Sequence, residues 1–168
     1  MRIMTSNNLK DAFAGESQAH MKYQIFSDEA AKDGFPNVSR MFKAIAHAEK
    51  VHARNHLKEL GGIGKLTDNL QAAYDGETFE VDEMYPAYKA VAELQQEKGA
   101  VRSAHYALEA EKIHAQMYAD AKKVVEAGSD IQLGTVQICE ICGYTGEGEA
   151  PAVCPVCGAP AGKFTAFE

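Results

Sequence analysis

Seven acidic and imidazole side chains fall on stretches of helical apolar periodicity, where a helical bundle buries hydrocarbon. An isolated buried carboxylate is very costly, so several facing one core need compensating positive charge. A pair of metal ions supplies that charge, and the pattern therefore predicts a two-metal site. The candidate ligands are Glu16, Glu49, His52, Glu80, Glu83, Glu111 and His114.

One motif, Glu-x-x-His, occurs twice among these residues, from Glu49 to His52 and from Glu111 to His114. Two side chains three residues apart on a helix project to the same side. A single such motif is commonly surface decoration. Two motifs, each in line with apolar neighbours and each in the second helix of a predicted hairpin, favour metal ligands.

Four predicted helices position these residues, with apolar side chains recurring at helical spacing in each. Asp33-Gly34 ends the first helix, and Pro36 suits the first turn of the second. Pro86 lies inside the third, where we expect a kink or a lost hydrogen bond. The expected helices cover residues 6–32, 36–60, 77–98 and 100–126.

The connections predict a topology. Short turns at residues 33–35 and at Gly99 make two antiparallel hairpins. Between them, residues 61–76 can reach roughly 50 Å when extended, and the second helix is about 37 Å long. One long crossover between two hairpins is the ferritin-like arrangement, whose bundles hold di-iron or di-manganese sites between Glu and Glu-x-x-His residues. We therefore expect a mainly α, ferritin-like four-helix bundle.

A second constellation lies near the C-terminal end. Two Cys-x-x-Cys turns can direct four thiolates at one zinc or iron ion, from Cys139, Cys142, Cys154 and Cys157. Residues 127–136 read as a linker, so we expect domains at 1–134 and 135–168. The second is too short to hold a core without a metal. The spacing does not choose between zinc and iron, but attachment to a two-metal bundle favours iron, as an electron supply.

Composition narrows the function classes. A net charge of −7 argues against nucleic acid or anionic membrane as the main partner. No segment approaches the roughly 18 apolar residues that span a bilayer, and the first residues lack an apolar stretch of signal-peptide type. We therefore expect a cytoplasmic protein, in whose reducing environment four clustered cysteines favour a metal over disulfides.

The chain resembles the rubrerythrin family over essentially its whole length. The runs that carry the resemblance are GESQAH around Glu16, EKVH at 49–52, FEVDEMYP around Glu80 and Glu83, and AEKIHAQMY around Glu111. The runs CEICGY and CPVCG look like a rubredoxin centre.

The resemblance implies a non-haem di-iron peroxidase that reduces hydrogen peroxide to water in oxidative stress protection. Two iron ions, bridged by oxo or carboxylate groups, would lie in the bundle, and one iron, with zinc as the alternative, in the four-cysteine site. One bundle iron would move between Glu83 and His52 as its oxidation state changes. The implied bundle ligands are Glu16, Glu49, Glu80, Glu83, Glu111 and His114, with His52 as a redox-dependent ligand.

The resemblance also implies partners. Electrons would come from an NAD(P)H-dependent reductase, often through a separate rubredoxin, and pass through the cysteine-bound iron. We expect a homodimer, since family members form dimers and some exchange helices between subunits.

Tyr23 and Tyr85 lie one or two turns from ligand candidates. Each either bonds to a metal carboxylate or donates a proton, a role we assign to Tyr23, or is a core tyrosine with a satisfied hydroxyl.

Two alternatives come from other function classes. One is a ferroxidase or iron-storing bundle of ferritin type, which would form a large shell. The other is a zinc-ribbon interaction module attached to a catalytically silent bundle, which would be colourless, whereas an oxidised iron tetrathiolate is red.

Overall fold

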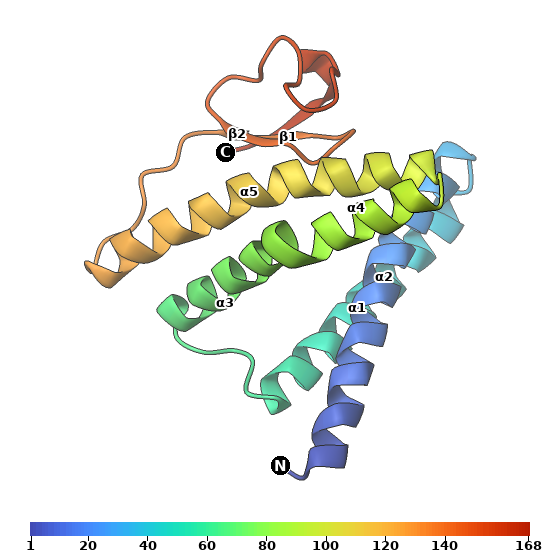
Figure 1. Cartoon of the computed structure of the whole chain (residues 1–168). Coiled ribbons are helices and arrows are strands. Elements are labelled where there is room, and N and C mark those ends of the chain that lie inside the picture. The colour runs from blue at the N-terminus through green and yellow to red at the C-terminus, as the bar shows by residue number, and fades with distance from the viewer. The chain divides into compact units, whose positions relative to one another are not determined.

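The first part of the chain is a helical hairpin, Met1–Gly64, made of α1 (Ile3–Lys32) and α2 (Pro36–Glu59). In the computed structural model, which describes all 168 residues, this hairpin is one of two units (Figure 1). Gly34 turns the chain with a φ of 82°, a value that glycine adopts without steric cost. Pro36 then begins α2, because its fixed φ suits the first helical turn.

Small and polar residues, together with aromatic contacts, hold the two helices of the hairpin together. Ala46 and Ala53 of α2 are buried. Ser27 of α1 is only 4% exposed, and its hydroxyl lies 2.9 Å from the Ser39 carbonyl and 3.0 Å from the Ser39 hydroxyl. Phe26 of α1 packs on Phe42 of α2, with ring centroids 5.7 Å apart, but many large apolar side chains stay exposed, so the hairpin buries only part of its apolar surface. They include Met21, Ile25, Phe26, Val38, Met41 and Ile45.

The second unit, Lys65–Glu168, contains three α-helices and a small sheet. The helices are α3 (Leu66–Phe79), α4 (Tyr85–Leu94) and α5 (Lys98–Glu126). A π-helical turn, η1 (Glu80–Met84), joins α3 to α4, and the Tyr85 N–H bonds to the Glu80 carbonyl five residues back. Pro86 has no N–H to give to an α-helical bond, and the predicted distortion near Pro86 is confirmed by this turn.

The start of α3 corrects the expected connection between the hairpins. The helix begins at Leu66, not near residue 77, so only residues 60–65 connect α2 to α3. The Asp68 carboxylate accepts the Lys65 backbone N–H at the helix start, 3.3 Å away. Gly76 does not end a loop but lies inside α3, because a helical glycine costs only about 1 kcal/mol. The mainly helical fold class is confirmed, whereas the long crossover over residues 61–76 is wrong.

The turn between α4 and α5 also differs from expectation. Helix α4 ends at Leu94 and α5 begins at Lys98, so Gly99 lies inside α5 and not in the turn. Gln96 makes the turn with a φ of 59°. A polar residue can adopt this left-handed conformation at modest cost, which is why no glycine marks the turn in the sequence.

The C-terminal module is a three-stranded antiparallel sheet of order β2-β1-β3. It comprises β1 (Val136–Cys139), β2 (Thr145–Glu147), the short helix η2 (Ala161–Lys163) and β3 (Phe164–Phe167). Three buried cysteines form its core, and Tyr106 of α5 packs against them. The module and α5 therefore pack together through Tyr106. None of the helices combines the length and the apolar character that a membrane span needs.

Replacing Ser27 by Val tests the hairpin. The change removes a buried hydroxyl that bonds to Ser39 across the two helices, so we expect the free energy of unfolding to fall by about 1–2 kcal/mol. Chemical denaturation followed by circular dichroism measures it. The exposed Ser103 of α5, also replaced by Val, controls for the change in helix propensity. Equal losses in the two variants would contradict the role of Ser27.

Candidate metal centres

The first unit brings three of the predicted ligands together. Glu16 comes from α1, and Glu49 and His52 come from successive turns of α2; their ligand atoms lie within 4.8 Å of one another. The His52 Nδ1 is 2.9 Å from a carboxylate oxygen of Glu49. The two carboxylates are half-buried, while the His52 side chain is 54% exposed. The hairpin therefore offers two fixed carboxylates and one more accessible imidazole.

The second unit contains a group of the same composition. Glu77 of α3 lies with Glu111 and His114 of α5, again with ligand atoms within 4.8 Å of one another. The His114 Nδ1 is 2.6 Å from a Glu111 carboxylate oxygen, and its Nε2 is 2.7 Å from the Thr145 hydroxyl. Each unit thus presents two carboxylates and one imidazole, half of the donor set of a two-metal bundle site.

The carboxylates of the second group repel one another. Burial, a hydrogen bond to Glu111 and the charges of Glu111 and Glu80 together raise the pKa of Glu77 to about 7. Burial and the charge of Glu111 also raise the pKa of Glu80. Like charges in a half-buried space hold protons that they would lose in water. A divalent cation would replace those protons, and carboxylates with imidazole suit iron, so the residues fit a metal site.

A tyrosine lies in the field of the same carboxylates. Burial and the charges of Glu80, Glu111 and Glu77 raise the pKa of Tyr85 above its usual value. Tyr85 therefore keeps its proton and can donate a hydrogen bond. Tyr23, the tyrosine that the sequence favoured as a proton donor, packs in unit 1 against Phe26 and Phe42, with ring centroids 6.4 and 6.1 Å away.

Three glutamates differ from the expectation, and one of them is the predicted ligand Glu80, which lies outside both groups of converging ligand atoms. Glu83 is exposed and lies outside both groups, although the sequence made it a ligand candidate. Glu77, which the sequence analysis did not select, takes a place beside Glu111 and His114. Its signal was the spacing: Glu77 precedes Glu111 by 34 residues, close to the 33 between Glu16 and Glu49. Glu77 was overlooked because residues 61–76 were expected to form a loop that ends just before it.

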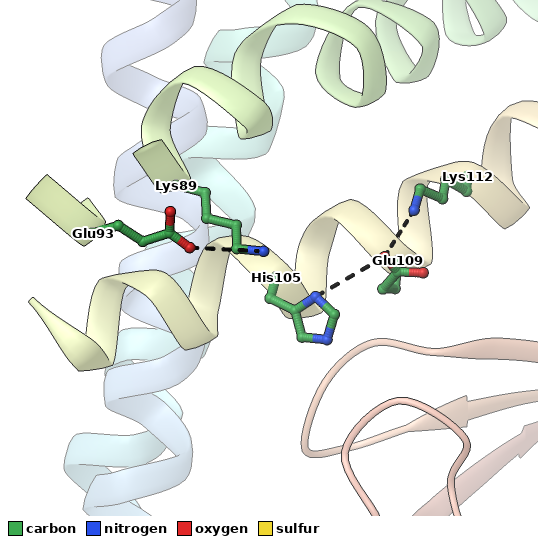
Figure 2. Close-up of polar contacts among 5 residues, drawn as sticks. All are labelled: Lys89, Glu93, His105, Glu109 and Lys112. Atoms are coloured by element: carbon green, nitrogen blue, oxygen red, sulfur yellow. Dashed lines mark hydrogen bonds and ion pairs between the residues drawn. The ribbon is translucent and has the colours of Figure 1, made fainter. Parts of the chain in front are cut away.

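Another histidine of α5 belongs to a surface network. Figure 2 shows His105 and Lys112 directed at Glu109, at 3.9 and 2.8 Å, and Lys89 near Glu93 at 3.9 Å. Lys112 bonds to Glu109 and, against a small effect of burial, lowers the pKa of its carboxyl. Exposed ion pairs of this kind contribute little to stability. His105 is therefore a surface residue of this network.

The four cysteines form a third group, buried in the C-terminal module. Their sulfur atoms lie within 4.8 Å of one another, with 3.6 Å between Cys139 and Cys157 and 3.5 Å between Cys142 and Cys154. All four are free thiols. Convergence of four sulfurs on one point matches a tetrahedral tetrathiolate site.

Two equivalent turns create this convergence. Gly143 donates its N–H to the Cys139 carbonyl, and Gly158 donates to the Cys154 carbonyl, at 2.8 and 3.0 Å. Both glycines have positive φ, 78° and 75°. Burial opposes ionisation of Cys154, but the N–H groups of Cys157 and Val156 outweigh it and lower the pKa of its thiol to about 7. These N–H groups therefore favour the thiolate, the form that binds metal, at Cys154, whereas burial raises the pKa of the Cys142 and Cys157 thiols.

Comparison with known families identifies both parts of the chain. Residues 7–122 match the sequence model of the rubrerythrin family, and residues 137–165 match that of the rubrerythrin rubredoxin-like domain. Each match covers one of the two kinds of site, the carboxylate groups in the helices and the four cysteines in the C-terminal module.

Individual relatives agree along nearly the full length. Rubrerythrin-2 of Clostridium acetobutylicum is 46% identical, over 98% of this chain and 97% of that protein. Rubrerythrin of Nitratidesulfovibrio vulgaris is 34% identical, over 95% and 92%. The solved structure of fully reduced nigerythrin is similar with a TM-score of 0.55 and 33% identity, over 97% of this chain and 86% of that one.

These matches confirm the resemblance that the sequence motifs carried. The cofactors of the family, a di-iron site in the helices and a four-cysteine rubredoxin-like site, match the donor groups described above. The chain belongs to the rubrerythrin family of di-iron oxidoreductases.

Proposed function

We propose that this protein is a peroxidase that reduces hydrogen peroxide to water in protection against oxidative stress. One observation carries the proposal: His114, beside Glu111 and Glu77, is hydrogen-bonded to the module that contains the four cysteines. Half of the donor set for two-electron chemistry and a site for one-electron relay are thus in contact within one unit. When bound, the iron pair supplies the two electrons that cleave the O–O bond.

The surrounding residues handle charge and protons. Reduction of one peroxide to two waters consumes two protons with the two electrons. Tyr85 stays protonated among the carboxylates and can orient peroxide or pass on a proton. Glu77, with its pKa near 7, can also hold a proton near neutral pH before metal binds. These placements favour Tyr85 over Tyr23 as the proton-donating tyrosine.

The proposed ligand set combines the two groups of donors with Glu80, whose pKa is raised by burial and by the charge of Glu111. We assign Glu16, Glu49 and His52 from the hairpin, with Glu77, Glu80, Glu111 and His114 from the second unit. Glu80 and not Glu83 is then the carboxylate that alternates with His52, because Glu80 faces the charges of Glu111 and His114 while Glu83 is exposed. The exposed imidazole of His52 has the freedom that such an exchange needs.

Electrons enter through the C-terminal module. Cys157 is the one cysteine of the four that is not buried, so a donor can approach the metal from its side. We assign the donor as an NAD(P)H-dependent reductase, acting directly or through a rubredoxin. Four free thiols at a metal site suit a reducing compartment, and we place the reaction in the cytoplasm.

The short connection between the hairpins supports a dimer with exchanged helices. Residues 60–65 reach about 20 Å when extended, but α2 has 24 residues and is about 36 Å long. A ferritin-like bundle needs a crossover that runs its length, and six residues are too few. We therefore propose that each complete site combines the hairpin of one chain with the second unit of another.

The exposed apolar surfaces of the units supply contacts for this assembly. Ile25, Met41 and Ile45 are exposed on the hairpin, and Phe79 and Val91 are exposed on the second unit. Patches of this kind on otherwise polar helices commonly mark interaction sites. Packing against a second copy would bury these apolar side chains while the helices keep their conformation.

Rapid mixing of the reduced, iron-loaded protein with hydrogen peroxide tests the activity. We expect both the bundle iron and the cysteine-bound iron to become oxidised, measured by visible absorption. His52→Ala should keep the fold and slow peroxide turnover about tenfold or more, because each decade costs only about 1.4 kcal/mol of barrier. His47→Ala on the same helix is the control. Centres that stay reduced would rule out the peroxidase.

Metal analysis of two glutamine variants tests the ligand assignment. Glu77→Gln removes a charged oxygen donor beside Glu111 and should lose at least one of the two bundle irons per chain. Glu83→Gln changes an exposed residue and should keep both. Mass spectrometry of the metals gives the ratio of iron to protein. Loss of iron from the Glu83 variant alone would restore Glu83 as a ligand and exclude Glu77.

Co-expression of two inactive chains tests the exchange of helices. One chain carries Glu49→Ala with His52→Ala, and the other carries Glu111→Ala with His114→Ala, each with a different affinity tag. In an exchanged heterodimer one of the two sites contains every ligand, so about half of the wild-type peroxidase activity and bundle iron should return. Each variant alone is the control. A heterodimer without iron or activity would show that each site forms within one chain.

A further inference from the structure

The two ring nitrogens of His114 have different neighbours. Nδ1 faces the carboxylates, 2.6 Å from Glu111, whereas Nε2 lies 2.7 Å from the hydroxyl of Thr145. Thr145 is the first residue of β2 and is only 4% exposed. It is one of two buried polar residues of the chain, and the only one beside a candidate metal ligand. A buried hydroxyl at this place requires a structural or functional reason.

The direction of the hydrogen bonds follows from the second partner of Thr145. Its hydroxyl also donates to the Gly143 carbonyl, 3.2 Å away. A threonine hydroxyl has one hydrogen and two lone pairs, so with that hydrogen on Gly143 it accepts from His114. The proton of a neutral His114 then lies on Nε2. Its lone pair is then on Nδ1, on the side of Glu111 and Glu77, where a metal can bind it; without a metal, a proton must lie between Nδ1 and the Glu111 carboxylate, which are 2.6 Å apart.

The turn of the first cysteine pair holds Thr145 in place. Thr145 pairs with Ile138 across β1 and β2, and the Cys139 N–H bonds to the Tyr144 carbonyl at 2.9 Å. Gly143 lies beside α5, because a Cβ built on it would be in ordinary van der Waals contact with the Ala110 methyl group, 3.9 Å away. Ala110 is itself buried. The position of the hydroxyl is therefore fixed by the turn that places Cys139 and Cys142.

We propose that Thr145 is a positioning residue, which fixes the tautomer and ring orientation of His114 so that Nδ1 is the metal-binding nitrogen. The bond runs between β2 and α5, so the cysteine module sets the geometry of a ligand in the helical site. The inference rests on the proposed role of His114 as a ligand. Hydrogen bonds from ligand histidines to such partners typically change metal affinity 10–100-fold.

NMR of the full chain loaded with zinc tests the proposal, because zinc is diamagnetic and binds the same donor types. In the wild type, nitrogen shifts of His114 should show a proton on Nε2 and metal on Nδ1, with slow exchange of that proton. Thr145→Val keeps the shape but removes the acceptor. The Nε2 proton should then exchange at least tenfold faster, and zinc affinity of the helical site should fall about tenfold.

Matched variants separate the hydroxyl from packing. Thr145→Ser keeps the hydroxyl and should restore both values, and Thr165→Val on the exposed β3 strand should change neither. Thr145→Ala is the second test if valine disturbs the turn, which the visible spectrum of the iron-loaded cysteine site would reveal. Wild-type exchange and affinity in both the Val and Ala variants would overturn the proposal.

The test also distinguishes this inference from the proposed function. If zinc leaves the wild-type His114 shifts unchanged, the ligand assignment is wrong, and the proposal falls with it. If His114 binds zinc through Nε2, the ligand assignment stands while the role of Thr145 is overturned. Binding through Nδ1 that weakens without the hydroxyl and returns with serine supports both.

Discussion

Mutual repulsion of carboxylates governs the helical part of this protein. Glu77, Glu80 and Glu111 lie close enough that burial and like charge raise the pKa of Glu77 to about 7. A helical pair that only needed stability would not place acids together on its inner side. Bound cations would offset this repulsion, and the family to which the chain belongs has a di-iron site in its helical part. The acidic residues of these helices therefore require bound cations to offset their charge.

Part of the site could be predicted because it is local. Glu49 with His52 and Glu111 with His114 are three residues apart, so helix geometry alone puts each pair on one side. The four-cysteine site could be predicted equally well, since two Cys-x-x-Cys turns define a tetrahedral site. Glu77 was missed because the glycine before it, Gly76, suggests a loop rather than a helix. In the structure, the packing of α3 on α5 outweighs the low helix propensity of this glycine.

Contacts between segments that are far apart in the chain could not be predicted from the sequence. Thr145 lies 31 residues from His114, and no periodicity links a strand residue to a helix residue. The short connection between α2 and α3 was missed for a different reason, because the polar residues before Gly76 resemble a loop, although Leu66, Leu70 and Tyr74 recur at helical spacing. The fold class survived these errors because it depends on apolar stripes, whereas topology depends on the length of one connection.

The side chains buried in the helices have a consequence for how the protein forms. The buried apolar residues of α2, α4 and α5 are alanines, at positions 46, 53, 92, 104 and 110, while isoleucines, methionines and phenylalanines stay exposed. Alanine buries little area, and burial is worth only about 25 cal/mol per Å². An isolated chain therefore gains little from closing its hairpins. In the dimer proposed above, folding and association become one concentration-dependent process, to which the contacts between chains add stability.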